Sequence, residues 1–125
     1  MKSFTKEELQ IELKSDGRHR RVLALCGTLS YNTADQLAKA FSSVMGKERS
    51  NVKQIVLDMR HVLSVDTTGA TMLRQLVREV EAYSVALLIA DHTDRPFYYA
   101  AGLDGRVRFL SQAEIATLPA YGTRI

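Results

Sequence analysis

The stretch LDMRHVLSVDTTGATML, from Leu57 to Leu73, joins an apolar strand to an amphipathic helix. It begins inside the run QIVLDM (Gln54–Met59), which is almost continuously apolar, as expected of a parallel strand covered on both faces. Beyond it, apolar residues recur at the spacing of one helical face: Leu73, Leu76, Val77 and Val80. Asp66 or Thr67 is predicted to cap the start of this helix through a side-chain oxygen, and Gly69 to let its first turn approach a neighbouring segment. The stretch therefore predicts a strand–loop–helix unit.

Segments on both sides of this unit continue the alternation of strands and helices. The turn Asp16-Gly17 predicts a hairpin between the first two strands. The further predicted strands are Ile11–Lys14, Arg21–Gly27, Val85–Asp91 and Val107–Leu110. The further predicted helices are Thr33–Gly46, Asp94–Gly102 and Ser111–Pro119. We therefore predict an α/β fold with a single mixed, mostly parallel sheet, in the order β-β-α-β-α-β-α-β-α, with helices packed on it.

Capping signals predict where two of these helices begin and where one of them ends. Thr33 and Gln36 have the spacing of a capping box, and Gly46 is predicted to end the helix that they begin. Ser111 and Glu114 have the same spacing at the start of the last helix.

Composition narrows the class of protein. The chain has 125 residues, of which 46% are hydrophobic and 25% charged, so we predict one domain spanning 1–125. A net charge of +3 is too small for a strong nucleic-acid footprint, and no apolar run is long enough to cross a bilayer. The N-terminus lacks a signal-peptide core, and the single cysteine, Cys26, lies in an apolar run. We therefore expect a cytoplasmic protein without direct membrane insertion.

Catalytic and cofactor motifs are absent from the sequence. No glycine-rich phosphate loop or nucleophile elbow occurs, and one cysteine with three scattered histidines supplies no metal cluster. Asp58 and Asp91 end predicted strands and are interpreted as turn residues. His61 is placed in the loop before the motif, where a surface position is expected. We therefore predict a protein that is not an enzyme and has no cofactor and no metal site.

On physics alone, the segment SVDTTGATML (Ser64–Leu73) has two readings, a helix cap or a site for phosphate. A helix start has free amides and positive partial charge, so it also tolerates a phosphate. Phosphorylation of Thr67 would add nearly two negative charges beside Asp66 and could repel a partner without unfolding the domain.

Three segments resemble the STAS domain family. LDMRHVLSVDTTGATML is similar to that family's strand, loop and Asp-[Ser/Thr]-[Ser/Thr]-Gly helix start. GTLSYNTADQL (Gly27–Leu37) is similar to its early loop and helix, and AAGLDGRVRF to its later helix–glycine–leucine segment. The resemblance covers about residues 9–118.

The resemblance implies a protein-interaction module and leaves two branches open. Anti-sigma-factor antagonists bind an anti-sigma factor, a serine/threonine kinase-like protein of bacterial transcription regulation, which phosphorylates the residue after the motif's acid. That residue is Thr67 here, with Thr68 as second choice. The alternative is the cytoplasmic regulatory domain of a sulfate-permease-type anion transporter, with the transporter's membrane domain as partner. The implied partner-binding residues are Ser30, Tyr31, Asn32, Asp66, Thr67, Thr68 and Gly69.

Overall fold

Five strands form one sheet in the part of the chain that the computed structural model describes, which comprises residues 9–48, 51–92, 95, 98, 102, 103 and 105–118. Their order across the sheet is β1-β2-β3-β4-β5, the same as their order in the chain. β1 pairs with β2 antiparallel, and the other three pairings are parallel. The mixed, mostly parallel sheet predicted from sequence is therefore confirmed. The strands are β1 (Leu9–Ser15), β2 (Arg20–Leu29), β3 (Gln54–Val65), β4 (Ala86–Ala90) and β5 (Arg108–Phe109).

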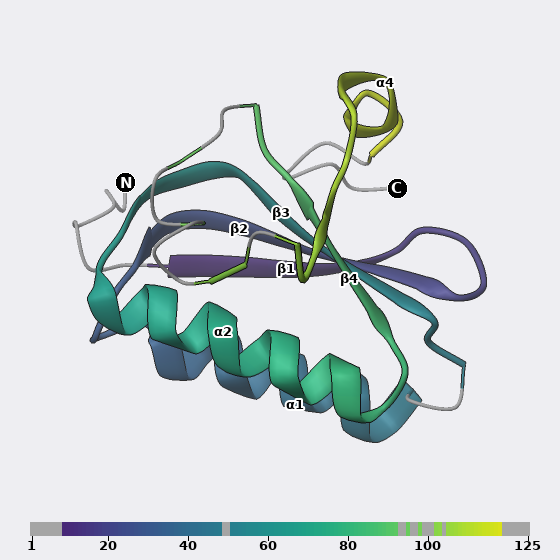
Figure 1. The fold of residues 1–125 in the computed structure, drawn as a ribbon, viewed down its shortest axis with the longest axis horizontal. Helices are drawn as coiled ribbons and strands as arrows, with labels where there is room; N and C mark the ends of the chain where they lie inside the picture. The colour runs from purple at the N-terminus through teal and green to yellow at the C-terminus, as the bar shows by residue number, and fades with distance from the viewer. Residues whose placement is uncertain are drawn as a thin grey trace, which may run out of the picture.

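Helices cover both faces of this sheet. The two long helices, α1 (Ala34–Glu48) and α2 (Thr67–Ala82), lie side by side on one face (Figure 1). The short helix α4 (Gln112–Ile115) lies on the other face. The buried side chains of β2, β3 and β4 divide between two clusters on opposite faces of the sheet, as the period of a strand requires. Alternate residues Ile55 and Leu57 of β3 join the larger cluster under α1 and α2, while Val56 joins the smaller cluster with Ile115 of α4.

α2 follows its predicted pattern closely. The predicted apolar face is buried, comprising Leu73, Leu76, Val77 and Val80. The Asp66 side chain caps the N-terminus, as predicted. At the other end, Ser84 has the left-handed φ of 58°, and the Val85 N–H donates to the Val80 carbonyl at 3.0 Å. Together with the Ser84 N–H, which donates to the Glu81 carbonyl at 3.4 Å, this bond pairs carbonyls of the last turn of the helix.

Two predictions about α1 are wrong. The helix continues past Gly46 to Glu48, because Gly46 keeps a helical backbone and its φ is not positive. The capping box of Thr33 and Gln36 does not form. The Thr33 hydroxyl instead donates to the Thr28 carbonyl at 2.6 Å, and the Gln36 side-chain amide donates to the Leu9 carbonyl at 3.4 Å.

β3 is longer than predicted and does not end at Met59. Its second half, up to Val65, pairs with the end of β2 after two register shifts. His61 therefore lies within a strand, opposite Cys26, rather than in a loop. The interpretation of Asp58 as a turn residue is also wrong. Asp58 is buried in the middle of β3, where the Arg60 guanidinium donates to both of its carboxylate oxygens at 2.8 and 2.6 Å.

The C-terminal part is confirmed only where the chain is described. The predicted capping box of Ser111 and Glu114 is present at the start of α4. Most of the predicted helix Asp94–Gly102 lies outside the described residues. Tyr98 is described and is almost fully buried, with its ring 5.1 Å from that of Phe109.

Candidate functional site

The Asp66 carboxylate joins the two segments that the sequence predicts to form the site. Its Oδ1 accepts from the Gly69 N–H at 2.8 Å and so caps α2. Its Oδ2 accepts from the Tyr31 N–H at 3.0 Å, in the loop between β2 and α1. The Asp66 N–H in turn donates to the Leu29 carbonyl at 3.1 Å. One acidic residue therefore fixes the early loop against the start of the motif helix.

Gly69 makes this close approach possible. A Cβ atom at position 69 would lie 2.5 Å from the Leu29 carbonyl oxygen and 3.0 Å from the Leu29 carbonyl carbon. Non-bonded carbon and oxygen atoms do not approach to 2.5 Å, and both of these atoms belong to the backbone of β2. Only glycine therefore lets the first turn of α2 rest on the end of β2.

The early loop is held by its own hydrogen bonds. The Thr33 hydroxyl accepts from the Ser30 N–H at 2.9 Å while it donates to Thr28. The Ser30 hydroxyl oxygen is buried and has no hydrogen-bond partner among the described residues. Asn32 and Tyr31 are exposed, Tyr31 to 78%. The loop thus holds an aromatic ring in solvent on an ordered backbone.

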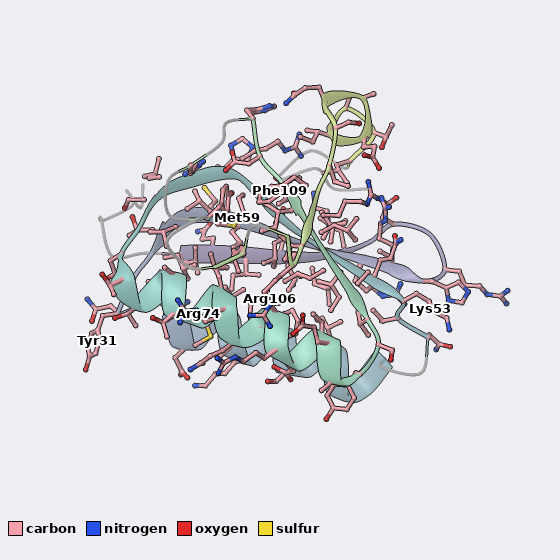
Figure 2. All side chains as sticks on the ribbon, in the orientation of Figure 1. Tyr31, Lys53, Met59, Arg74, Arg106 and Phe109 are labelled. Atoms are coloured by element: carbon pink, nitrogen blue, oxygen red, sulfur yellow. The ribbon has the colours of Figure 1, made fainter. Side chains whose placement is uncertain are left out.

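The two motif threonines are both exposed at the start of α2. No described residue is hydrogen-bonded to the Thr67 hydroxyl, whereas the Thr67 carbonyl accepts from the Thr71 hydroxyl at 3.0 Å. The first turn of α2 contains no acidic side chain. Arg74 lies two turns along the same helical face, exposed to solvent (Figure 2). Apart from the capping Asp66, the first two turns of α2 therefore carry one charged side chain, the positive Arg74.

The proposed site residues lie at one end of the molecule. Figure 2 shows Tyr31 projecting from the end at which α2 begins, and Lys53 at the opposite end. The structure brings Tyr31, Asp66 and Gly69 into direct contact, and it places Asn32, Thr67 and Thr68 on the exposed surface around them.

An arginine that the sequence analysis did not single out supports this end of the sheet. β3 pairs with β4 only as far as Asp58, so the carbonyls beyond it lose their partners on that side. Arg95 donates to the carbonyls of Met59 at 3.1 Å and Val62 at 2.7 Å. Its guanidinium also pairs with Asp91 at 2.7 Å.

The Tyr98 hydroxyl also donates to the Asp91 carboxylate at 2.6 Å, at the same oxygen, Oδ2, that pairs with Arg95. Arg95 therefore stabilises the extension of β3 that leads into the motif. The i, i+4 spacing of Asp91 and Arg95 is the only sequence signal that could have indicated the pair.

The described part of the chain contains no cluster of metal ligands and no activated cysteine. Its histidines, cysteine and acidic residues form no group of three that could hold a metal ion. Burial, with a contribution from the charge of Glu12, raises the pKa of the Cys26 thiol, which makes it a poor nucleophile at neutral pH. None of the described helices has the length and apolar character needed to cross a membrane.

The sequence of residues 10–104 matches the family model of the STAS domain. The chain belongs to the STAS domain family. The match includes the early loop, the Asp66 cap and the whole of α2. No curated protein matches this STAS domain at a significant level.

Solved structures share the fold of this STAS domain. A crystal structure of an anti-sigma factor antagonist from Mycobacterium paratuberculosis has a TM-score of 0.74 at 16% identity, covering 90% of this chain and 95% of that one. The phosphorylated form of the Bacillus cell fate determinant SpoIIAA has a TM-score of 0.64 at 18% identity, covering 86% of this chain and 96% of that one. The murine Solute Carrier 26 family member A9 anion transporter has a TM-score of 0.63 at 17% identity, covering 82% of this chain and 18% of the transporter.

Proposed function

We propose that this STAS domain is an anti-sigma-factor antagonist in a bacterial pathway of transcription regulation. In this proposal the chain acts in the cytoplasm as one domain, with a core of about residues 9–118. It binds an anti-sigma factor that is also a serine/threonine kinase-like protein, and phosphorylation of Thr67 switches that binding off. Two of the structures that share its fold are an anti-sigma factor antagonist and the phosphorylated form of SpoIIAA.

The observation that carries the proposal is that the Asp66 side chain is fully engaged in hydrogen bonds to the backbone. Both of its carboxylate oxygens are engaged by backbone N–H groups, of Tyr31 and of Gly69. The cap is therefore complete without the Thr67 side chain, which is left exposed. A hydroxyl that the fold does not need is free to be modified without loss of structure.

A phosphate at Thr67 would act on binding rather than on folding. The start of α2 carries positive partial charge and tolerates an anion. The phosphate would nevertheless add nearly two negative charges beside Asp66, on the surface that includes the exposed Tyr31 ring. A partner that packs on Tyr31 would meet this new charge and its bound water.

Binding rather than catalysis is the proposed activity. Among the described residues around the motif, the hydroxyls of Thr67 and Thr68 have no histidine or carboxylate hydrogen-bonded to them as a general base. The Asp66 carboxylate is already occupied by two N–H groups. The site is suited to recognition by its exposed loop and helix start.

The second candidate function is that of a regulatory domain of an anion transporter. The exposed aromatic Tyr31 in the early loop and the fold shared with the murine anion transporter favour it. In that case the same surface would bind the transporter's membrane domain, with a nucleotide or anion at the helix start.

The test compares variants at adjacent positions. Thr67→Glu should weaken binding to the kinase-like partner at least about tenfold, or about 1.4 kcal/mol. Thr67→Ala should bind but accept no phosphate, and Thr68→Ser should leave both properties nearly unchanged. Ser43→Glu places the same charge on an exposed position of α1 and should bind as the parent does.

The measurements are titration calorimetry and phosphate incorporation from ATP, against each ATP-binding kinase-like protein encoded next to this one. Parent-like binding by Thr67→Glu, together with no phosphate on Thr67, would refute the switch and favour the transporter domain.

A further inference from the structure

Among the described residues, β1 is an edge strand with no strand paired on its outer side. It pairs with β2 alone, in a register that includes Leu13 opposite Leu23. The Asp16 N–H donates to the Arg20 carbonyl at 3.1 Å, so this pair belongs to the hydrogen-bonded class of the ladder. Because the two classes alternate along an antiparallel pair, even-numbered residues of β1 direct their backbone groups to β2. Ile11, Leu13 and Ser15 therefore direct theirs outward.

Two features that commonly protect an edge strand, a proline and a β-bulge, are absent from β1, which does carry the charged residues Glu12 and Lys14. β1 contains no proline, and the register shifts of the sheet lie between β2 and β3. In the described part of the chain, no residue bonds to the outward backbone groups of Ile11, Leu13 or Ser15. Leu13, at the centre, has 51% of its surface exposed. An open strand edge with an exposed apolar residue is a template for another strand.

The charges of β1 fit a second copy of the same strand. Glu12 and Lys14 flank Leu13 and lie 3.5 Å apart on one face. In an antiparallel two-fold pairing centred on Leu13, Glu12 of each copy lies directly opposite Lys14 of the other. Both such pairs bring opposite charges together, which stabilises cross-strand neighbours. A pairing centred on Ile11 would place Glu12 opposite Gln10 and would gain no charge pair between residues of the described strand, Leu9–Ser15.

We propose that two copies of this chain associate through β1, antiparallel and centred on Leu13, to form one continuous sheet. The two outward Leu13 backbones form a hydrogen-bonded pair, and the exposed Leu13 side chains cover each other across the two-fold axis. The paired edge contains none of the residues of the motif or of the early loop. The association is therefore independent of the proposed partner-binding site.

The first experiment measures association and blocks it at the edge. The full chain should show a concentration-dependent monomer–dimer equilibrium in sedimentation velocity runs. Leu13→Pro removes an N–H that points outward, so the ladder with β2 stays intact while the dimer is lost. Circular dichroism verifies that this variant is folded. A parent that stays monomeric up to about 1 mM, or a folded Leu13→Pro that dimerises like the parent, overturns the proposal.

The second experiment tests the register with cysteines, in a Cys26→Ser background that removes the single native thiol. Across the proposed axis the two copies of position 13 have Cα atoms about 5.5 Å apart, within disulfide range. The copies of position 15 are offset by four residues, about 14 Å, which is too far. Leu13→Cys should therefore cross-link under mild oxidation and Ser15→Cys should not. Equal cross-linking at both positions contradicts the register.

A charge exchange tests the pairing without altering the backbone. Glu12→Lys should weaken dimerisation at least about tenfold, because it places two lysines opposite each other at both ends of the pair. The double variant Glu12→Lys/Lys14→Glu should restore it. If the double variant is as weak as the single one, the proposed alignment of the two strands is wrong. This comparison also decides the matter if Leu13→Pro does not fold.

Discussion

Gly69→Ala should destabilise the domain, although it places a better helix former inside α2. An alanine in a helix interior is favoured over glycine by about 1 kcal/mol. Position 69 has a helical backbone, so the substitution creates no dihedral strain of its own. The effect therefore depends on what the added methyl group would contact.

The contact outweighs the gain in helix propensity. The new Cβ would lie 2.5 Å from the Leu29 carbonyl oxygen, well inside the 3.4 Å at which ordinary contact begins. The obstructing atoms are backbone, so α2 or the end of β2 must move, and overpacking of this kind costs about 1–3 kcal/mol. Such a movement would also strain the bonds of Asp66 to Gly69 and Tyr31. We expect a net loss of about 1–2 kcal/mol, or about 4–8 °C in Tm.

Gly46→Ala is the matched control. Gly46 also lies inside a long helix, but a Cβ there would meet no atom within 4 Å. This variant should be more stable than the parent by about 0.5–1 kcal/mol. Urea denaturation of both variants, with unchanged m-values, measures the difference. If Gly69→Ala is as stable as Gly46→Ala, the close approach of α2 to β2 is not what selects glycine at position 69.

Two further predictions concern helix ends. Ser84 has the left-handed φ of 58° and is exposed, so Ser84→Gly should raise the free energy of unfolding by about 0.5–1 kcal/mol, and an unchanged denaturation midpoint would contradict this. The Ser111 N–H, followed by the Arg108 guanidinium, lowers the pKa of the Glu114 carboxyl. Because the folded pKa lies below the unfolded value of about 4.3, this contribution is present above pH 4.3 and is lost as pH falls through the folded pKa. NMR titration should find the Glu114 carboxyl titrating below free glutamate, and Arg108→Ala, which removes the second cause, should move its pKa part of the way back toward the usual value.

Local signals in the sequence predicted local structure well. The Asp66 cap, the buried face of α2 and the capping box of α4 all depend on residues within two turns of one another. The residues that define each feature are neighbours in the chain, so spacing and residue type suffice to predict them. The alternation of strands and helices along the chain then limited the ways in which the strands could be arranged in one sheet.

Two of the wrong predictions, the capping box of α1 and the loop around His61, fail because partners outside the local segment compete. Thr33 and Gln36 have the right spacing for a capping box, but their side chains bond to the carbonyls of Thr28 and Leu9 instead. The strand that contains His61 continues because the end of β2 is available to pair with it. No pattern within a helix or strand indicates such partners.

In the candidate site too, sequence predicted the local features but not the contacts between distant segments. Sequence alone identified Asp66 and Thr67 and placed them at a helix start. It could not show that the second oxygen of Asp66 binds the Tyr31 N–H, 35 residues earlier in the chain. Nor could it show that Arg95 holds the carbonyls of Met59 and Val62 beneath the motif. Both contacts require the assembled sheet.

The matching order of the strands in space and in the chain has a consequence for biosynthesis. As the polypeptide leaves the ribosome, each new strand adds to the edge of the sheet already formed, and none has to insert between two earlier strands. The early loop and the start of α2 can therefore meet before β4 is translated. Until β4 arrives, however, β3 is the growing edge, and its apolar residues Ile55, Val56 and Leu57 lack their final neighbour. During the synthesis of residues 57 to 90 the nascent chain therefore carries an apolar strand edge that is open to misassembly.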